Sequence, residues 1–150
     1  MDEFGRPLPN PAADGYRNPS LAADSAGTRV VNGKLQVLLI TRGMEPSKGK
    51  LALPGGFVNY NEDPEDAAIR ELKEECGIIG EVVEVLCVLG DPARDPRKHV
   101  VTIVYLVSAN AEPIAGDDAA DAAWFELDEC LGFPAERWAF DHHEVVSMLT

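Results

Sequence analysis

The stretch around residue 70 restricts the fold more than any other, because it carries signals for both ends of one helix. Asp63 suits the N-cap position, and Pro64 suits the first helical residue, where a missing N–H costs little. Gly77 suits the left-handed conformation that commonly ends a helix. The sequence therefore predicts a helix from Pro64 to about Cys76.

Three glutamates share one face of this helix. Glu71, Glu74 and Glu75 are spaced i, i+3, i+4, whereas Ile69 and Leu72 belong to a stripe with core-like spacing. Like charges at this spacing destabilise a helix unless a partner compensates. From the helix alone two interpretations stay open: a solvated acidic face, or a site for a hard dication such as Mg²⁺, which prefers oxygen ligands.

Length and charge exclude several classes of protein. The chain has 150 residues, of which 45% are hydrophobic, and a formal net charge of −13 at pH 7. This length predicts one domain, and the acidic balance disfavours a nucleic-acid partner. A small anionic substrate stays compatible if a bound cation offsets the local field. Apolar runs such as residues 37–40 are too short to span a bilayer, so no membrane partner is expected.

The cysteines and the N-terminal residues indicate the cellular compartment of the protein. Cys76, Cys87 and Cys130 match no zinc pattern, and their odd number favours reduced thiols. Residues 1–4 show no basic segment leading into an apolar core, so no signal peptide is expected. We therefore expect a cytoplasmic protein.

Prolines and turn residues divide the chain. Residues 1–19 contain four prolines and are expected to form an extended arm, either a disordered leader or an arm docked on a site or a dimer partner. Residues 20–150 are expected to form a single domain. Asn32-Gly33 predicts a hairpin between residues 28–31 and 34–40. Further strands are predicted at 51–53, 81–89, 100–107 and 122–126, and a terminal helix at 141–149.

Residues 56–78 resemble the signature of the Nudix hydrolases. They match G-x5-E-x7-R-E-U-x-E-E-x-G-U, where U is a bulky aliphatic residue, at every defined position. The resemblance implies an α/β protein, an α/β/α sandwich with a mixed central sheet and the box helix packed on it. It also implies hydrolysis of a nucleoside diphosphate linked to another group.

The resemblance also assigns roles within the box. Arg70 is similar to the residue that orients the glutamates, and Glu62 to a loop glutamate with a supporting or distal metal role. Mg²⁺ is the implied cofactor, with Mn²⁺ as a substitute. The residues that resemble the family's metal ligands are Glu71, Glu74 and Glu75 and the carbonyl of Gly55 or Gly56.

The chemistry requires these residue types. A pyrophosphate bridge is densely anionic and resists attack by water, and a hard cation neutralises its oxygens and lowers the pKa of a bound water. A carboxylate can then act as general base. Glu71, Glu74, Glu75 and Asp118 all stay open for that role; Asp118 lies outside the box and is equally a candidate metal ligand or a loop aspartate.

Segments outside the box bear on the substrate. Five of them resemble ADP-ribose pyrophosphatases of archaea and bacteria, and the sensor domain of related transcription regulators: residues 16–20, 53–58, 90–97, 117–118 and 139–142. The resemblance covers roughly residues 16 to 145 and implies cleavage of ADP-ribose into AMP and ribose 5-phosphate. One departure is residues 22–27, Ala-Ala-Asp-Ser-Ala-Gly, which are weak as the first strand of that subgroup.

Candidate substrate-binding residues follow from their side-chain chemistry. Arg94 and Arg97 offer planar donors for phosphate or ribose, or else they belong to an exposed turn. Arg42 follows a strand end near the box and could meet the phosphates or remain a surface cation. Phe57 could touch the base or simply pack. His142 is interpreted as a surface or helix-end residue, with a weaker alternative as a substrate contact.

Three functions therefore stay open. The leading one is ADP-ribose hydrolysis. The second is a Nudix hydrolase acting on oxidised nucleoside triphosphates, NADH or a sugar nucleotide. The third is a non-catalytic ADP-ribose sensor, disfavoured because the box keeps every glutamate and the chain ends at Thr150 without a winged-helix domain. A small-molecule nucleotide is the expected partner, and a homodimer stays open.

Overall fold

The computed structural model of the protein describes residues 16–116 and 118–150. Residues 1–15 of the expected arm, and Asp117 of the Asp117-Asp118 pair, lie outside the described residues. Among the residues described, no helix has the length and apolar composition to cross a membrane. The elements are, in order, β1 (Ser20–Val31), β2 (Lys34–Arg42), β3 (Leu51–Ala52), β4 (Gly55–Phe57), α2 (Pro64–Cys76), β5 (Glu81–Leu89), β6 (Val100–Ser108), β7 (Ala119–Glu126), α3 (Leu127–Leu131), the 3-10 turn η1 (Ala135–Arg137) and α4 (His142–Ser147).

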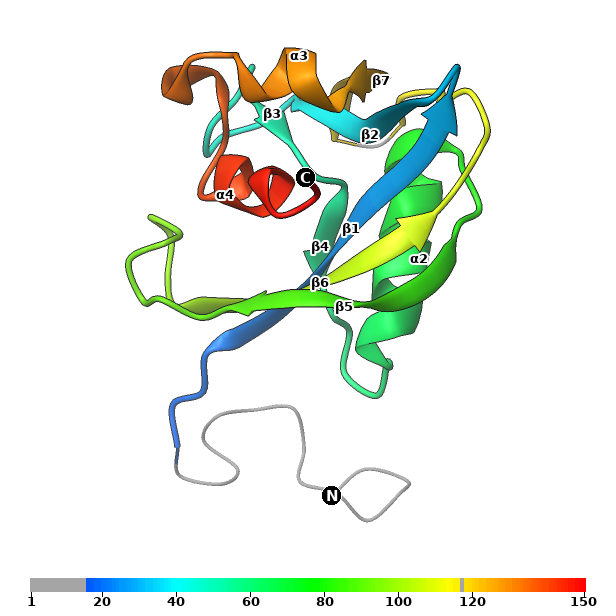
Figure 1. The fold of residues 1–150 in the computed structure, drawn as a ribbon. Coiled ribbons are helices and arrows are strands. Elements are labelled where there is room, and N and C mark those ends of the chain that lie inside the picture. The colour runs from blue at the N-terminus through cyan, green and yellow to red at the C-terminus, as the bar shows by residue number, and fades with distance from the viewer. Residues whose placement is uncertain (1–15, 117) are drawn as a thin grey trace.

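The described strands form one mixed sheet around β1 (Figure 1). β1 runs parallel to β6, pairing Ser20 with Val100 and Thr28 with Ser108. Its first half pairs antiparallel with β4, and its last residues form the predicted Asn32-Gly33 hairpin with β2. β2 then leaves β1 and pairs with β7 and β3, while β5 closes the far edge beside β6. The main strand order is β3-β2-β1-β6-β5.

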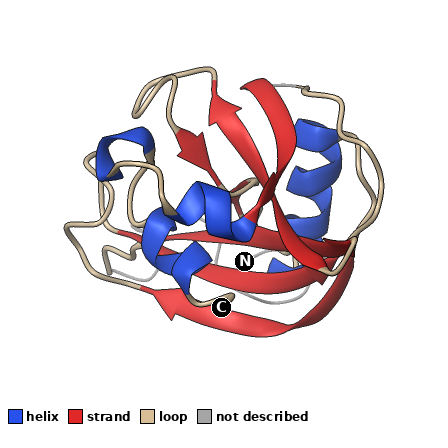
Figure 2. Cartoon of the chain, turned by 45° about the horizontal axis from the view of Figure 1, so that its top comes forward, coloured by secondary structure: helices blue, strands red, loops and turns tan. Residues whose placement is uncertain are grey.

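Helices cover both faces of this sheet (Figures 1 and 2). α2 packs on one face through a core that includes Ala67, Leu72 and Leu38. α3 and α4 pack on the other face, where Cys130, Val145 and strand residues make a second core. The expected α/β/α sandwich is confirmed. The terminal helix is shorter than residues 141–149, and α3 was not predicted.

Both ends of α2 lie where their sequence signals predict. Asp63 Oδ1 accepts a hydrogen bond of 2.9 Å from Glu65 N, and Pro64 is the first helical residue. Gly77 closes the helix at φ 68°, and its N–H donates to Lys73 O. These capping contacts are local, which is why sequence alone places them.

The expectation that residues 22–27 are weak as a strand is wrong. These residues lie in the middle of β1, and all are buried. Their side chains are short because α2 and neighbouring strands approach closely: Ser25 Oγ donates 3.2 Å to Ala68 O in α2, and a Cβ on Gly27 would lie 3.4 Å from Leu38 Cβ. Pairing and burial override low strand propensity here.

A substitution in β1 tests this packing. Ala23 is fully buried, whereas Val30 on the same strand is 67% exposed. We expect Ala23→Leu to lower the free energy of unfolding by about 1–3 kcal/mol, because the core has no space for the added atoms. The control Val30→Leu should change it by less than about 0.5 kcal/mol. Urea denaturation followed by circular dichroism measures both; equal effects would contradict the buried placement of β1.

Candidate functional site

A cleft of about 330 Å³ lies where β1, β4 and α2 meet three loops. The loops are the one after β2, the one between β5 and β6, and the segment that precedes α4. Its titratable and aromatic lining residues are Asp24, Arg42, Glu45, Phe57, Glu71, Glu75, Arg94, Asp95, Arg97, Asp118, Phe140 and His142.

Most of the residues singled out from sequence meet in this cleft. The box helix contributes two of its glutamates, the end of β2 and the loop between β5 and β6 contribute three arginines, and the residue before β7 is an aspartate. The predicted residues in the lining are Arg42, Gly56, Gly55, Phe57, Glu71, Glu75, Arg94, Arg97 and Asp118. Glu62, Arg70 and Glu74 lie outside the lining, and Glu74 is exposed.

Arg70 lies outside the cleft lining and donates hydrogen bonds to three of the box glutamates. Its Nε and Nη2 donate 2.7 and 2.9 Å to the two carboxylate oxygens of Glu62, and its Nη2 also reaches Phe57 O at 3.1 Å. Its Nη1 donates 2.8 Å to Glu71 and 3.2 Å to Glu74. Hydrogen bonding from Arg70 lowers the pKa of Glu62. The guanidinium thus ties the loop before α2 to the glutamate face, and this supports the orienting role that the box implies.

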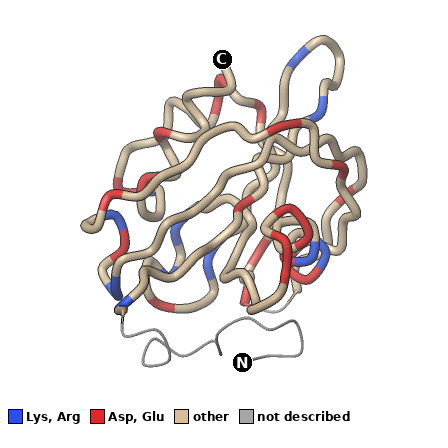
Figure 3. Tube along the Cα trace, turned by 90° about the horizontal axis from the view of Figure 1, so that it is seen from below, with Lys and Arg blue, Asp and Glu red and all other residues tan. Residues whose placement is uncertain are grey.

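Negative charge is concentrated where α2 faces β1. Glu75 is 8% exposed, and its Oε2 accepts 3.0 Å from Gly55 N. The pKa of Glu75 is raised to about 8, chiefly by burial. The hydrogen bond from Gly55 lowers this pKa, whereas the charges of Glu71 and Asp24 raise it. Burial likewise raises the pKa of Asp24 to about 6, although Thr102 Oγ1 donates to it at 2.7 Å. Figure 3 shows acidic residues gathered along the coil of α2.

Two glycines permit these carboxylates to approach the backbone. A Cβ on Gly56 would lie 2.6 Å from the carboxyl carbon of Glu71, and a Cβ on Gly55 would overlap Oδ1 of Asp24. Any larger residue at either position would push a carboxylate away. The glycine pair is therefore a steric requirement of the site.

The donor set fits a hard divalent cation. Within residues 16–116 and 118–150, no three His, Cys, Asp or Glu side chains are gathered into a ready metal site. Arg70 and Gly55 N hold oxygens of Glu71 and Glu75 instead. These two glutamates nevertheless offer oxygen ligands to one cleft and repel each other, and a dication would relieve that repulsion.

Arginines contribute positive charge to the same cleft. Arg42 Nε donates 2.7 Å to Pro46 O, and Arg97 pairs with Asp95 at 2.7 and 3.1 Å. Arg94 is held by two hydrogen bonds, of 2.9 and 2.7 Å, to Asp141. Asp118 lines the cleft as an exposed residue, and its carbonyl accepts 2.9 Å from Gly43 N. The cleft thus presents carboxylates and guanidinium groups together.

The lining residues that sequence reasoning did not single out include Asp24, Thr102 and Phe140, and it misjudged the environment of His142. Asp24 is the single charged residue of residues 22–27, a signal only once that stretch is known to be a central strand. His142 lies at the end of a helix, as the first residue of α4, but the surface interpretation is wrong, since it is 5% exposed. Its Nδ1 accepts 2.9 Å from Leu53 N, which leaves the proton on Nε2, 3.9 Å from Asp24 Oδ2.

Comparison with known proteins gives consistent matches. Residues 22–149 match the NUDIX domain family. An ADP-ribose pyrophosphatase of Methanocaldococcus jannaschii is 40% identical over 87% of this chain and 73% of its own length. The ADPR responsive transcriptional repressor NtrR of Acinetobacter baylyi is 35% identical over 87% of this chain, which spans only 53% of that protein. The NUDIX domain of Shewanella oneidensis NrtR, solved with ADP ribose, superposes with a TM-score of 0.82 at 28% identity, covering 99% of this chain and 97% of that one.

The buried His142 predicts a pH dependence of stability. Burial lowers the pKa of His142 to about 4 from 6.5; the charge of Asp141 opposes this, whereas Arg94 and Arg42 reinforce it. The unfolded chain therefore takes up a proton between pH 6.5 and 4 that the folded protein refuses, and stability falls as pH falls through this window.

We expect His142→Gln, whose amide oxygen can still accept the Leu53 N–H, to remove this component. Its loss of unfolding free energy between pH 6.5 and 4 should be smaller than that of the wild type by about 3 kcal/mol. Urea titrations at a series of pH values measure the difference. Parallel pH profiles would show that His142 is not buried in its neutral form.

Proposed function

The chain belongs to the Nudix family, and on this basis we propose that it hydrolyses the pyrophosphate bond of ADP-ribose with Mg²⁺, releasing AMP and ribose 5-phosphate. One observation carries the proposal: the box glutamates Glu71 and Glu75 line the same cleft as Arg42 and Arg97. Binding a diphosphate requires carboxylates that hold a cation beside it, and it also requires hydrogen-bond donors for the remaining phosphate oxygens. This cleft offers both kinds of group. The 40% identity with an archaeal ADP-ribose pyrophosphatase supports the choice of substrate.

The chain's own residues divide the work. Glu71, Glu75 and the carbonyl of Gly55 or Gly56 would hold the cation, with Glu74 and Glu62 as outer candidates. When bound, a divalent cation neutralises phosphate oxygens and lowers the pKa of a water. Arg70 keeps Glu71 aimed at the cleft through its 2.8 Å hydrogen bond.

The remaining residues orient the substrate. Arg42 and Arg97 donate to the diphosphate, and Phe57, which is 39% exposed, offers a ring at the rim for the substrate's apolar surface. Arg94 supports the loop between β5 and β6 through Asp141. Glu71, Glu74, Glu75 and Asp118 remain the candidates for the general base.

Glu75→Gln tests the site directly. The amide keeps an oxygen for the Gly55 N–H but loses the charge, so we expect kcat for ADP-ribose to fall by about 10²–10⁴-fold with little loss of stability. Release of AMP in Mg²⁺, followed by liquid chromatography, measures it. The matched control is Glu84→Gln on the exposed edge of β5, which should keep the wild-type rate. A Glu75→Gln protein with near wild-type kcat at saturating Mg²⁺ would remove Glu75 from the mechanism.

The same assay separates the other functions. If the wild type released no AMP from ADP-ribose but cleaved oxidised nucleoside triphosphates, NADH or a sugar nucleotide, the substrate assignment would be wrong. The similarity to the Acinetobacter repressor favours a second candidate, an ADP-ribose sensor. Tight binding of ADP-ribose without turnover in Mg²⁺ would support the sensor instead.

We further infer the cellular compartment, the partner and the oligomeric state of the enzyme. The three free cysteines, two of them buried, support a reducing cytoplasm. The net charge of −13 supports a small nucleotide rather than nucleic acid as the partner. Association into a homodimer is a proposal that light scattering would test.

A further inference from the structure

Phe140 is held in the cleft because the residues before and after it, Ala139 and Asp141, both make hydrogen bonds to other parts of the fold. Ala139 N donates 2.8 Å to Leu51 O in β3. Asp141 accepts both hydrogen bonds from Arg94, whose side chain is only 6% exposed. These contacts tie the segment before α4 to β3 and to the loop between β5 and β6. Phe140 therefore has little freedom to leave the cleft.

The backbone of Phe140 adopts an unfavourable conformation. Its φ is 50°, in the left-handed region that bulky residues rarely occupy. Such a conformation is unfavourable for a bulky residue and persists only where the surroundings enforce it. Residues of this kind often occur at functional sites, so the groups that contact the ring are of interest.

Two guanidinium groups of the cleft share the Phe140 ring. The Cζ of Arg42 lies 5.1 Å from the ring centroid, and the Cζ of Arg97 lies 5.9 Å from it and 5.3 Å from the centroid of the Phe57 ring. Both distances are within the range of cation–π attraction. The two arginines also repel each other: burial lowers the pKa of Arg42, and the charge of Arg97 lowers it further. The ring thus attracts two cations that repel one another.

We propose that Phe140 is a positioning residue that sets the places of Arg42 and Arg97 for the diphosphate of the substrate. This rests on the proposed function for the identity of the diphosphate, but the geometry of the ring and the two arginines stands without it. An aliphatic side chain would fill similar space and would lack the negative face that draws both guanidinium groups to one spot. Phe140 then acts through the arginines and touches no reacting atom.

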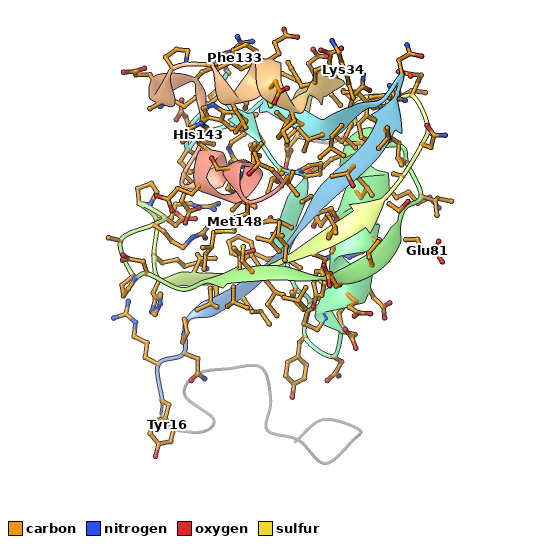
Figure 4. The ribbon with its side chains drawn as sticks, viewed as in Figure 1. Tyr16, Lys34, Glu81, Phe133, His143 and Met148 are labelled. Carbon is orange, nitrogen blue, oxygen red and sulfur yellow. The ribbon has the colours of Figure 1, made fainter. Side chains whose placement is uncertain are left out.

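Steady-state kinetics with Mg²⁺ and ADP-ribose separate positioning from chemistry. We expect Phe140→Leu to raise KM about tenfold and to change kcat less than about threefold, because binding is weakened before the chemical step. Phe140→Trp keeps an aromatic face and should restore KM to within about threefold. The matched control is Phe133→Leu, which removes an aromatic ring 4.1 Å from Arg137 at the α3 end of the molecule (Figure 4) and should leave KM unchanged.

A double-mutant cycle tests whether Phe140 acts through Arg97. If it does, the combined effect of Phe140→Leu and Arg97→Ala on ln KM should fall short of the sum of the two single effects, because only the contribution made through Arg42 remains once Arg97 is removed. Independent, additive effects, or a KM of Phe140→Leu within twofold of the wild type, would overturn the inference.

Two further measurements test the role of Phe140 even if a variant misfolds or the protein does not hydrolyse ADP-ribose. In the wild type, ring currents should shift the NMR signals of the Arg42 and Arg97 Nε–H groups, and unshifted signals would overturn the inference without any variant. If the wild type fails to hydrolyse ADP-ribose, the proposed function fails, and calorimetric titration with inorganic pyrophosphate decides the role of Phe140. Weaker binding by Phe140→Leu would then support positioning, and equal binding would overturn it.

Discussion

The close approach of α2 to the middle of β1 governs the rest of the structure. Only small side chains fit between them, as the buried Ala23, Ser25 and Ala68 show. Because the helix lies so near the strand, Glu75 meets the backbone of β4, and the carboxylate of Asp24 lies on the same side of the cleft. A larger residue in the middle of β1 would separate the carboxylates from the glycines of β4. Packing and chemistry are therefore set by the same contact.

This contact gathers negative charge, and the fold compensates it in two ways. Arg70 pairs with Glu62, Glu71 and Glu74 on the outer side of the helix. Three arginines also line the cleft: Arg42 at the end of β2, and Arg94 and Arg97 in the loop between β5 and β6. Glu71, Glu75 and Asp24 still repel one another, which adds to burial in raising the pKa of Glu75 and of Asp24, and a divalent cation would relieve this repulsion. The carboxylates that repel one another in the cleft are therefore those that would hold a divalent cation.

The sequence predicts those features that depend on neighbouring residues. The ends of α2, the Asn32-Gly33 hairpin and the glutamate face follow from capping, turn chemistry and helical spacing. It does not predict features that depend on distant segments. Residues 22–27 have the composition of a loop until their partners in the sheet are known, and the burial of His142 requires Leu53, just after β3, to lie against the start of α4. Phe140 was visible only as part of a motif, because its role depends on two arginines far away in the chain.

The parallel pairing of β1 with β6 also bears on how the chain reaches this structure. It joins Ser20 to Val100 and Thr28 to Ser108, so most of the domain lies between the paired residues. The entropy of closing such a loop must be offset before the pairing contributes, which slows folding compared with domains built from local contacts. Until β6 arrives, the β1–β2 hairpin can form locally, yet it leaves one edge of β1 unpaired. Such an unpaired edge can pair with another chain while folding is incomplete.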